Sequence, residues 1–253
     1  MKKLILLSLI ISLLIAGSAF QSNFKTKISF QPVAVIELFT SQGCSSCPSA
    51  DQLLSQTINE TKKDGRKIFA LSFHVDYWNR LGWADPFSAK EYSQRQRTYA
   101  AQLNDNSVYT PQMIVNGSRQ FVGSDALDLK DALNKSLNTA PAAVFKTLTA
   151  SVQINAPPRV KFSLDGNYAG CNINFALISL SETTSIKRGE NGGLTLSNEN
   201  IVRQFITVPA TAEGIINFKL SPVPSSASNM AIVAYLQQSS NLKITGASMA
   251  EIK

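Results

Sequence analysis

Two cysteines, Cys44 and Cys47, have a type and spacing that suit redox chemistry. An apolar run, residues 33–39, precedes them, and Pro48 opens a sequence typical of a helix. Unpaired N–H groups and the helix dipole stabilise a thiolate at a helix N-terminus, lowering its pKa from ~8.5 to about 3.5–7.5. We therefore expect Cys44 to be an exposed, ionisable thiol just ahead of the helix, with Cys47 close enough to form a disulfide. A structural disulfide or half of a zinc site would fit the same spacing.

The elements around this pair predict where it lies. Residues 68–75, IFALSFHV, form a second apolar run, so the pattern predicts two parallel strands joined by a helix. Sites in such sheets gather at the carboxyl ends of the strands. His74 and Asp76 end the second strand and should share an edge with Cys44.

His74 is the only histidine of the chain and allows three interpretations. It could be a hydrogen-bonded structural residue, or its imidazolium could stabilise the Cys44 thiolate. It could also join Cys44 and Cys47 as a third ligand, in a set that suits Cu(I) or, less well, zinc. The neighbouring charged residues that could orient it are Asp76, Arg80 and Asp85.

Glu37 lies inside the first predicted strand, where both faces should be covered. A buried, unpaired carboxylate is costly, so its pKa should rise toward the range that suits proton transfer with Cys47. Alternatively, Glu37 pairs with a lysine or arginine, or lies at an open edge of the strand.

Two further segments supply candidate substrate-binding residues. Trp78 and Trp83 belong to a turn-rich aromatic stretch and either pack locally or line a groove beside the cysteines. Thr110-Pro111 begins a short strand. Pro111 is either a plain edge residue or a cis-proline facing the cysteines, which would leave the Thr110 backbone open to a substrate strand.

The chain changes character near residues 139–143. Residues 143–253 contain many short apolar runs separated by turn signals, a pattern typical of an antiparallel sandwich. Their most polar loop is RGENGG, residues 188–193, which is either a plain hairpin loop or folds over the cysteine edge. In the second case, exchanging Arg188 or Glu190 should change thiol reactivity.

Residues 1–19 have two lysines, an apolar core and a small-residue end, which predicts a secretory signal peptide rather than an uncleaved anchor. We expect an exported protein, periplasmic or extracellular, with no membrane span in the mature chain. The formal charge of +7 includes Lys2 and Lys3, and the sequence contains no long run of lysines or arginines. Nucleic-acid binding is therefore not indicated. The third cysteine, Cys171, should be a buried small apolar residue.

The order of these elements resembles a thioredoxin fold. The segments ELFTSQGCSSCP, SFHVDYWNRLGWADPFS, YTPQMIVNG and RGENGGLTLSNENIVR resemble the secreted thioredoxin-like family catalogued as domain of unknown function family 1223. The resemblance implies that Cys44 attacks, Cys47 resolves and Pro111 is the cis-proline. Glu37 is similar to the buried acid that assists the resolving cysteine, although it lies one residue further from the first cysteine. CSSC departs from the usual CGPC, so no redox potential carries over.

Together these patterns predict an α/β thioredoxin-like domain, residues 30–139, followed by an all-β sandwich-like domain, residues 143–253. The predicted activity is thiol–disulfide exchange on protein or small thiol substrates, with an unidentified redox partner and no cofactor. The alternatives are a copper-handling protein that uses Cys44, Cys47 and His74, and a non-catalytic binding module with a structural disulfide.

Overall fold

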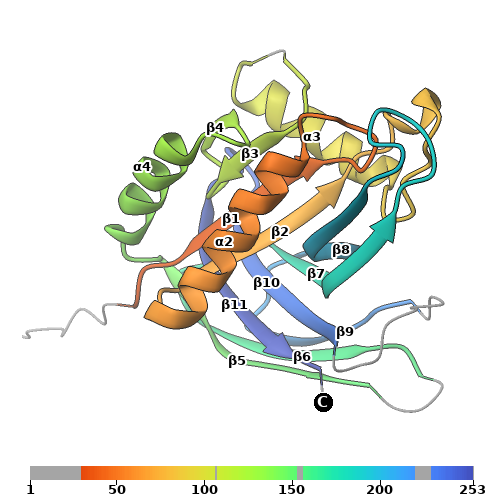
Figure 1. The fold of residues 1–253 in the computed structure, drawn as a ribbon. Helices are drawn as coiled ribbons and strands as arrows, with labels where there is room; N and C mark the ends of the chain where they lie inside the picture. Colours follow the sequence, from red (N-terminus) through yellow and green to blue (C-terminus); the bar gives the residue numbers. More distant parts are fainter. Residues whose placement is uncertain (1–29, 106, 153–155, 220–228, 253) are drawn as a thin grey trace, which may run out of the picture.

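A computed structural model describes residues 30–105, 107–152, 156–219 and 229–252, built around one eight-stranded mixed sheet (Figure 1). In spatial order, its strands are β11 (Ile244–Glu251), β10 (Met230–Gln238), β7 (Cys171–Ser185), β8 (Thr195–Pro209), β2 (Ile68–His74), β1 (Ala34–Thr40), β3 (Gln112–Val115) and β4 (Arg119–Val122). A three-stranded sheet contains β5 (Ala143–Ser151), β6 (Arg159–Gly166) and β9 (Glu213–Asn217). The helices are α2 (Pro48–Asp64), α3 (Lys90–Gln102), α4 (Ala126–Leu137) and the short 3-10 helix η1 (Asn79–Leu81). The predicted signal peptide, residues 1–19, lies outside the described residues.

The strand–helix–strand unit around the cysteines is confirmed. β1 and β2 pair in parallel, with Thr40 opposite His74 at their carboxyl ends, and α2 connects them. β3 runs antiparallel to β1 on its other side. The unit therefore places the end of β1, the start of α2 and the end of β2 at one edge of the sheet.

The predicted fold class, an α/β thioredoxin-like domain followed by an all-β sandwich-like domain, is wrong. β8 pairs in parallel with β2 at Ser72 and Ile201, so four strands from the second half extend the same sheet. Asn200 reinforces the junction by donating an Nδ2 hydrogen bond of 3.0 Å to the carbonyl of Ala70. The physical reason is that, without β8, the edge of β2 away from β1 would be open. Pairing with β8 satisfies backbone groups at that edge. The division of the chain into two domains, residues 30–139 and 143–253, stays a prediction.

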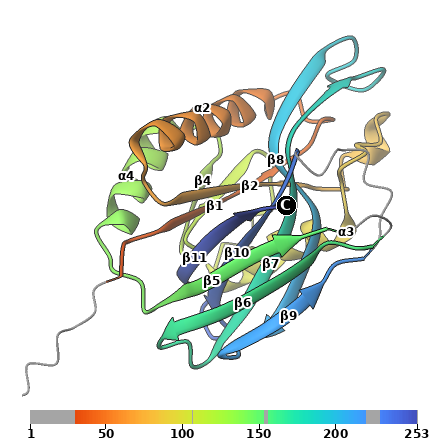
Figure 2. The same cartoon turned by 90° about the horizontal axis from the view of Figure 1, so that it is seen from below.

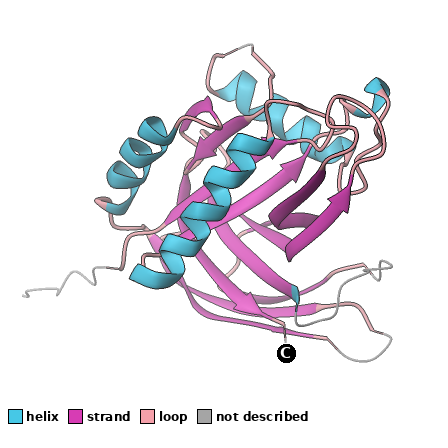
Figure 3. Ribbon diagram, viewed as in Figure 1, coloured by secondary structure: helices cyan, strands magenta, loops and turns pink. Residues whose placement is uncertain are grey.

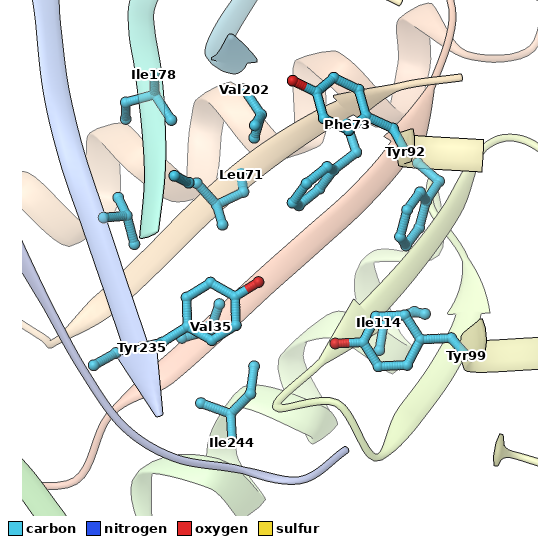
Figure 4. Packing of buried hydrophobic residues seen from close by; sticks show 14 of the residues in the cluster. Val35, Leu71, Phe73, Tyr92, Tyr99, Ile114, Ile178, Val202, Tyr235 and Ile244 are labelled. Carbon is cyan, nitrogen blue, oxygen red and sulfur yellow. The ribbon is translucent and has the colours of Figure 1, made fainter. Parts of the chain in front are cut away.

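Three apolar clusters hold the layers together. One lies between α2, α4 and the face of β1 that carries Ile36 and Leu38. A second lies on the opposite face, where Val35 and the tyrosines of α3 meet the side chains of β10 and β11 (Figure 4). The third fills the space between β7, β10 and the small sheet, which lies below them in Figure 1 and in front of them in Figure 2. Both faces of β10 are thus covered, which explains its nearly continuous apolar sequence.

The helices gather around the part of the sheet formed by β1 to β4, whereas the opposite end of the molecule consists of strands (Figure 3). Within the described ranges, none of the helices has the length and apolar character needed to cross a bilayer.

Candidate functional site

The two cysteines lie where the sequence predicted them, between the carboxyl end of β1 and the N-terminus of α2. They form a disulfide with their Cα atoms 5.4 Å apart. Cys47 is the N-cap of α2 and Pro48 occupies its first turn, where a missing N–H costs no hydrogen bond. The N–H of Cys44 donates to the carbonyl of Ser41 at 3.2 Å, which closes the turn leading into the helix. The backbone thus aligns the pair with the positive end of the helix dipole.

The predicted exposure of Cys44 is wrong in this disulfide form. Cys44 and Cys47 both have 0% of their surface exposed, whereas Ser45 and Ser46 between them are exposed. The attacking thiol expected from the sequence is therefore covered by other parts of the chain.

Residues 186–194, at the tip of the β7–β8 hairpin, are the lid loop. The Nδ2 group of Asn191 donates hydrogen bonds of 2.9 Å to the carbonyls of Gln42 and Cys44. Glu190 accepts a 3.0 Å hydrogen bond from the N–H of Ser45, and hydrogen bonding from Ser45 lowers the pKa of this carboxyl. In Figure 1 the hairpin tip lies beside the turn before α2. The hypothesis that this loop folds over the cysteine edge is confirmed.

Trp78 connects the cysteine turn to the Thr110–Pro111 segment. Its Nε1 donates a 2.7 Å hydrogen bond to Thr110 Oγ1, and its Cβ lies 3.4 Å from the place a Cβ on Gly43 would occupy. The Thr110–Pro111 bond is cis, as predicted. A Cβ on Gly123 would lie 3.0 Å from Pro111 Cβ and 3.2 Å from Ala50 Cβ, so Pro111 lies near the first turn of α2. The structure thus brings Thr110, Pro111 and Trp78 to the cysteine edge.

Trp83 lies on the other side of the turn, beneath the lid loop. Its Nε1 donates a 3.1 Å hydrogen bond to Gln42 Oε1. Its Cβ would lie 3.2 Å from a Cβ on Gly189, whose φ of +82° also favours glycine. Trp83 therefore supports the lid loop in its closed position. Its role in binding a substrate stays a prediction.

His74 is fully buried and pairs with Asp85, one of the residues predicted to orient it. The distance from His74 Nδ1 to Asp85 Oδ2 is 2.7 Å, and the same oxygen accepts a 2.8 Å hydrogen bond from the N–H of Gln42. Burial works against the charged imidazole, but the carboxylates of Asp85 and Asp51 raise the pKa of His74 above its ordinary value. Asp76, by contrast, hydrogen-bonds Ser93 of α3.

Replacing Asp85 with asparagine is expected to lower the free energy of unfolding by about 1–3 kcal/mol, because it removes the charged partner of a buried imidazole. The pKa of His74 is raised in the folded protein, so the His74–Asp85 pair stabilises the fold fully below the ordinary pKa of histidine, about 6.5. This stabilisation is lost as pH rises through the raised pKa. Denaturant unfolding should therefore show a larger difference from wild type near pH 6 than near pH 9. The exposed substitution Asp165→Asn is the control, and an equal loss at both pH values would contradict the assignment.

Glu37 adopts the arrangement in which it pairs with an arginine. Its carboxylate accepts hydrogen bonds of 2.6 and 2.7 Å from Arg95 of α3, and one each from the hydroxyls of Tyr99 and Tyr235. Side chains alternate along a strand, so Glu37 lies on the face of β1 opposite α2 and Cys47. The predicted proton transfer between Glu37 and Cys47 is therefore not supported by this geometry.

Sequence reasoning missed a carboxyl on the cysteine side of β1, that of Asp51 in the first turn of α2. Thr40 Oγ1 donates a 3.3 Å hydrogen bond to its Oδ2, and burial raises the pKa of Asp51 to about 6. An acidic residue in a first helical turn ordinarily complements the helix dipole at the surface, so its type gave no signal. Its only sequence signal is its position four residues after Cys47, which places both on one helix face.

No group of three or more histidine, cysteine, aspartate or glutamate side chains in the described ranges is arranged to hold a metal ion. In this form both sulfurs are bonded to each other. The alternative that Cys44, Cys47 and His74 bind Cu(I) concerns the reduced pair and stays a prediction. Cys171 is buried with a free thiol, as expected.

Comparisons with known proteins find a matching family model and similar solved structures. A family model described as "Protein of unknown function (DUF1223)" matches residues 35–237. A crystal structure of a protein from Agrobacterium tumefaciens is similar, with 29% identity, a TM-score of 0.65, and coverage of 87% of this chain and 94% of that one. HBP35 of Porphyromonas gingivalis shares the fold, with 13% identity, a TM-score of 0.59, and coverage of 88% and 76%. No curated protein shows a significant match to the chain.

Proposed function

Because the chain belongs to DUF1223, a family of unknown function, we propose from the geometry of its own site that it is an exported thiol–disulfide oxidoreductase. The observation that carries this proposal is the Cys44–Cys47 pair at the N-terminus of α2. A thiolate formed there is stabilised by the unpaired N–H groups of the first helical turn. Export rests on the signal-peptide pattern of residues 1–19.

The reaction is thiol–disulfide exchange. In the reduced protein, the Cys44 thiolate attacks a disulfide of a protein or small-molecule substrate and forms a mixed disulfide. Cys47 then attacks Cys44 Sγ, releases the substrate as a thiol and regenerates the internal disulfide. A redox partner returns the pair to its starting state.

Access to the pair requires the lid loop to move. The sulfurs are fully buried, and the hydrogen bonds from Asn191 and to Glu190 hold the loop against the cysteine turn. Trp78 and the Thr110–Pro111 segment, already at the cysteine edge, would then border the opened site. Their contact with a substrate is part of the proposal.

Substituting Cys44 with serine is expected to abolish insulin reduction by the mature protein, because the attacking thiolate is lost. Cys171→Ser is the matched control and should retain wild-type activity, since Cys171 lies at the start of β7. The wild-type pair should also reach a reversible equilibrium with mixtures of reduced and oxidised glutathione, measured by alkylation and mass spectrometry.

A pair that stays oxidised in the folded protein under excess reduced glutathione would contradict the proposal. The disulfide would then be structural, as in the binding-module alternative. Stoichiometric Cu(I) binding by the reduced protein, lost in His74→Ala, would instead support the copper-handling alternative.

A further inference from the structure

A cluster of titratable groups lies behind the cysteine turn, with His74 and Asp85 buried and Asp51 half-buried, and it is not used by the reaction proposed above. It contains the carboxyl of Asp51 from α2, His74 from the end of β2, and Asp85 from the following segment. Gln42 connects the cluster to the turn, because its N–H donates to Asp85 while its Nε2 donates to Asn198 of β8 at 3.2 Å.

Two atoms of this cluster have no hydrogen-bond partner among the described residues. They are Asp51 Oδ1 and His74 Nε2, and both are buried. Buried polar atoms are nearly always hydrogen-bonded, so an orphaned pair calls for a functional explanation. The two side chains interact electrostatically, and each therefore influences whether the other holds a proton.

The surroundings hold Asp51 ready to exchange a proton near neutral pH. Burial raises the pKa of Asp51 to about 6, and the negative charge of Asp85 acts in the same direction, whereas His74 and hydrogen bonding from Thr40 and Asn198 oppose it. Arg203 of β8 also faces the cluster and opposes protonation of His74. A group whose pKa is close to the working pH is suited to general acid–base chemistry.

Asp51 lies one helical turn after Cys47. The N–H of Asp51 donates a 3.0 Å hydrogen bond to the carbonyl of Cys47, and residues four apart lie on one face of a helix. Thr40, which holds the Asp51 carboxyl, projects from the face of β1 that α2 covers. Glu37 projects from the other face and is neutralised by Arg95.

We propose that Asp51 exchanges the proton of Cys47 when the disulfide opens and closes, with Thr40 holding its carboxyl and the charges of His74 and Asp85 acting on it. This inference rests on the proposed function and assigns a catalytic residue to it. Asp51 would touch the reacting sulfur of Cys47, whereas His74 and Asp85 act through Asp51.

The step balances for reduction by a dithiol. The first thiolate of the dithiol attacks Cys44 Sγ, the Cys44–Cys47 bond breaks, and the electron pair goes to Cys47 Sγ, which takes the proton of Asp51. The second thiolate of the dithiol then attacks the dithiol's first sulfur in this mixed disulfide and releases Cys44 as a thiolate. The dithiol leaves as a disulfide, oxidised by two electrons. Water carries one of its two thiol protons back to Asp51, and the other passes to the solvent.

The test is the rate at which dithiothreitol reduces the mature protein from pH 5 to pH 8.5, divided by the thiolate fraction of the reagent. In wild type this corrected rate should fall about tenfold or more as pH rises through about 6, because Asp51 loses its proton. Asp51→Asn should give a flat profile. Asp64→Asn, an exposed position at the end of the same helix, should behave as wild type.

An Asp51→Asn profile with the wild-type inflection would overturn the proposal while leaving thiol–disulfide exchange intact. Failure of the proposed function would give a different result, namely a wild-type disulfide that is not reduced under native conditions. If Asp51→Asn does not fold, carbon-13 NMR titration of the wild-type carboxyls replaces it. One aspartate should titrate near pH 6 and shift by about a unit or more when the disulfide is reduced, and no such shift would also overturn the proposal.

Discussion

Replacing Arg95 with methionine is expected to lower the free energy of unfolding by about 3–5 kcal/mol, because it leaves the buried carboxylate of Glu37 without its cation. Glu37 is fully buried, and the Arg95 side chain is only 14% exposed. The guanidinium also donates to the Tyr99 and Tyr235 hydroxyls at 2.9 Å and lies 4.7 Å from the centre of the Phe205 ring. Chemical denaturation measures the loss.

Arg97→Met is the matched control for this prediction. Arg97 lies on the same helix but is exposed, and its substitution should change stability by no more than about 0.5 kcal/mol. Adding Glu37→Gln to Arg95→Met should recover part of the loss, because the uncompensated charge is gone. Equal effects of Arg95→Met and Arg97→Met would show that the ion pair contributes little.

The cluster around Glu37 also explains why the fold class could not be predicted from the sequence. It joins β1, α3 and β10, since Arg95 reaches Glu37 on one side and Gln237 on the other. Apolar periodicity predicts strands and helices locally, but it does not specify which strand fills an open sheet edge. The strand pattern in residues 143–253 fitted a separate sandwich equally well.

The placement of the cysteines was predictable because it depends on local order alone. A strand, a turn, the Cys44-x-x-Cys47 pair and Pro48 at a helix start occupy fewer than 20 consecutive residues. Their burial could not be derived from local order, because Asn191, which holds the lid loop against the turn, lies 147 residues from Cys44 in sequence. The glycines of the lid loop indicated a turn, but the amide that fastens it gave no signal.

Asp51 shows the same limit at a single residue. Its spacing from Cys47 was visible, but the pairing of β8 with β2 brings Asn198 and Arg203 to the cluster in which the carboxyl lies. Without that pairing, the first turn of α2 would face solvent on this side, and an aspartate there would be an ordinary helix-capping charge. The electrostatic character of the site therefore follows from the tertiary fold.

Replacing Asn191 with alanine is expected to speed reduction of the disulfide about 10- to 30-fold. The substitution removes both hydrogen bonds that fasten the lid loop to the carbonyls of Gln42 and Cys44. Each contributes about 1 kcal/mol, and every 1.4 kcal/mol changes the open population about tenfold. If reduction occurs only from the open state, its rate follows that population. The measurement is the rate of thiol appearance in excess dithiothreitol at fixed pH.

Leu194→Ala is the control for the lid, because Leu194 belongs to the same loop but is 50% exposed. Its reduction rate should stay close to that of wild type. Global unfolding is excluded as the route if both variants retain a free energy of unfolding well above the opening energy, since opening through unfolding would track that quantity. If Asn191→Ala is reduced at the wild-type rate, the reductant reaches the sulfurs by a path that does not involve the lid loop. The most direct such path passes Trp78 and Thr110, which are hydrogen-bonded to each other on the other side of the cysteine turn.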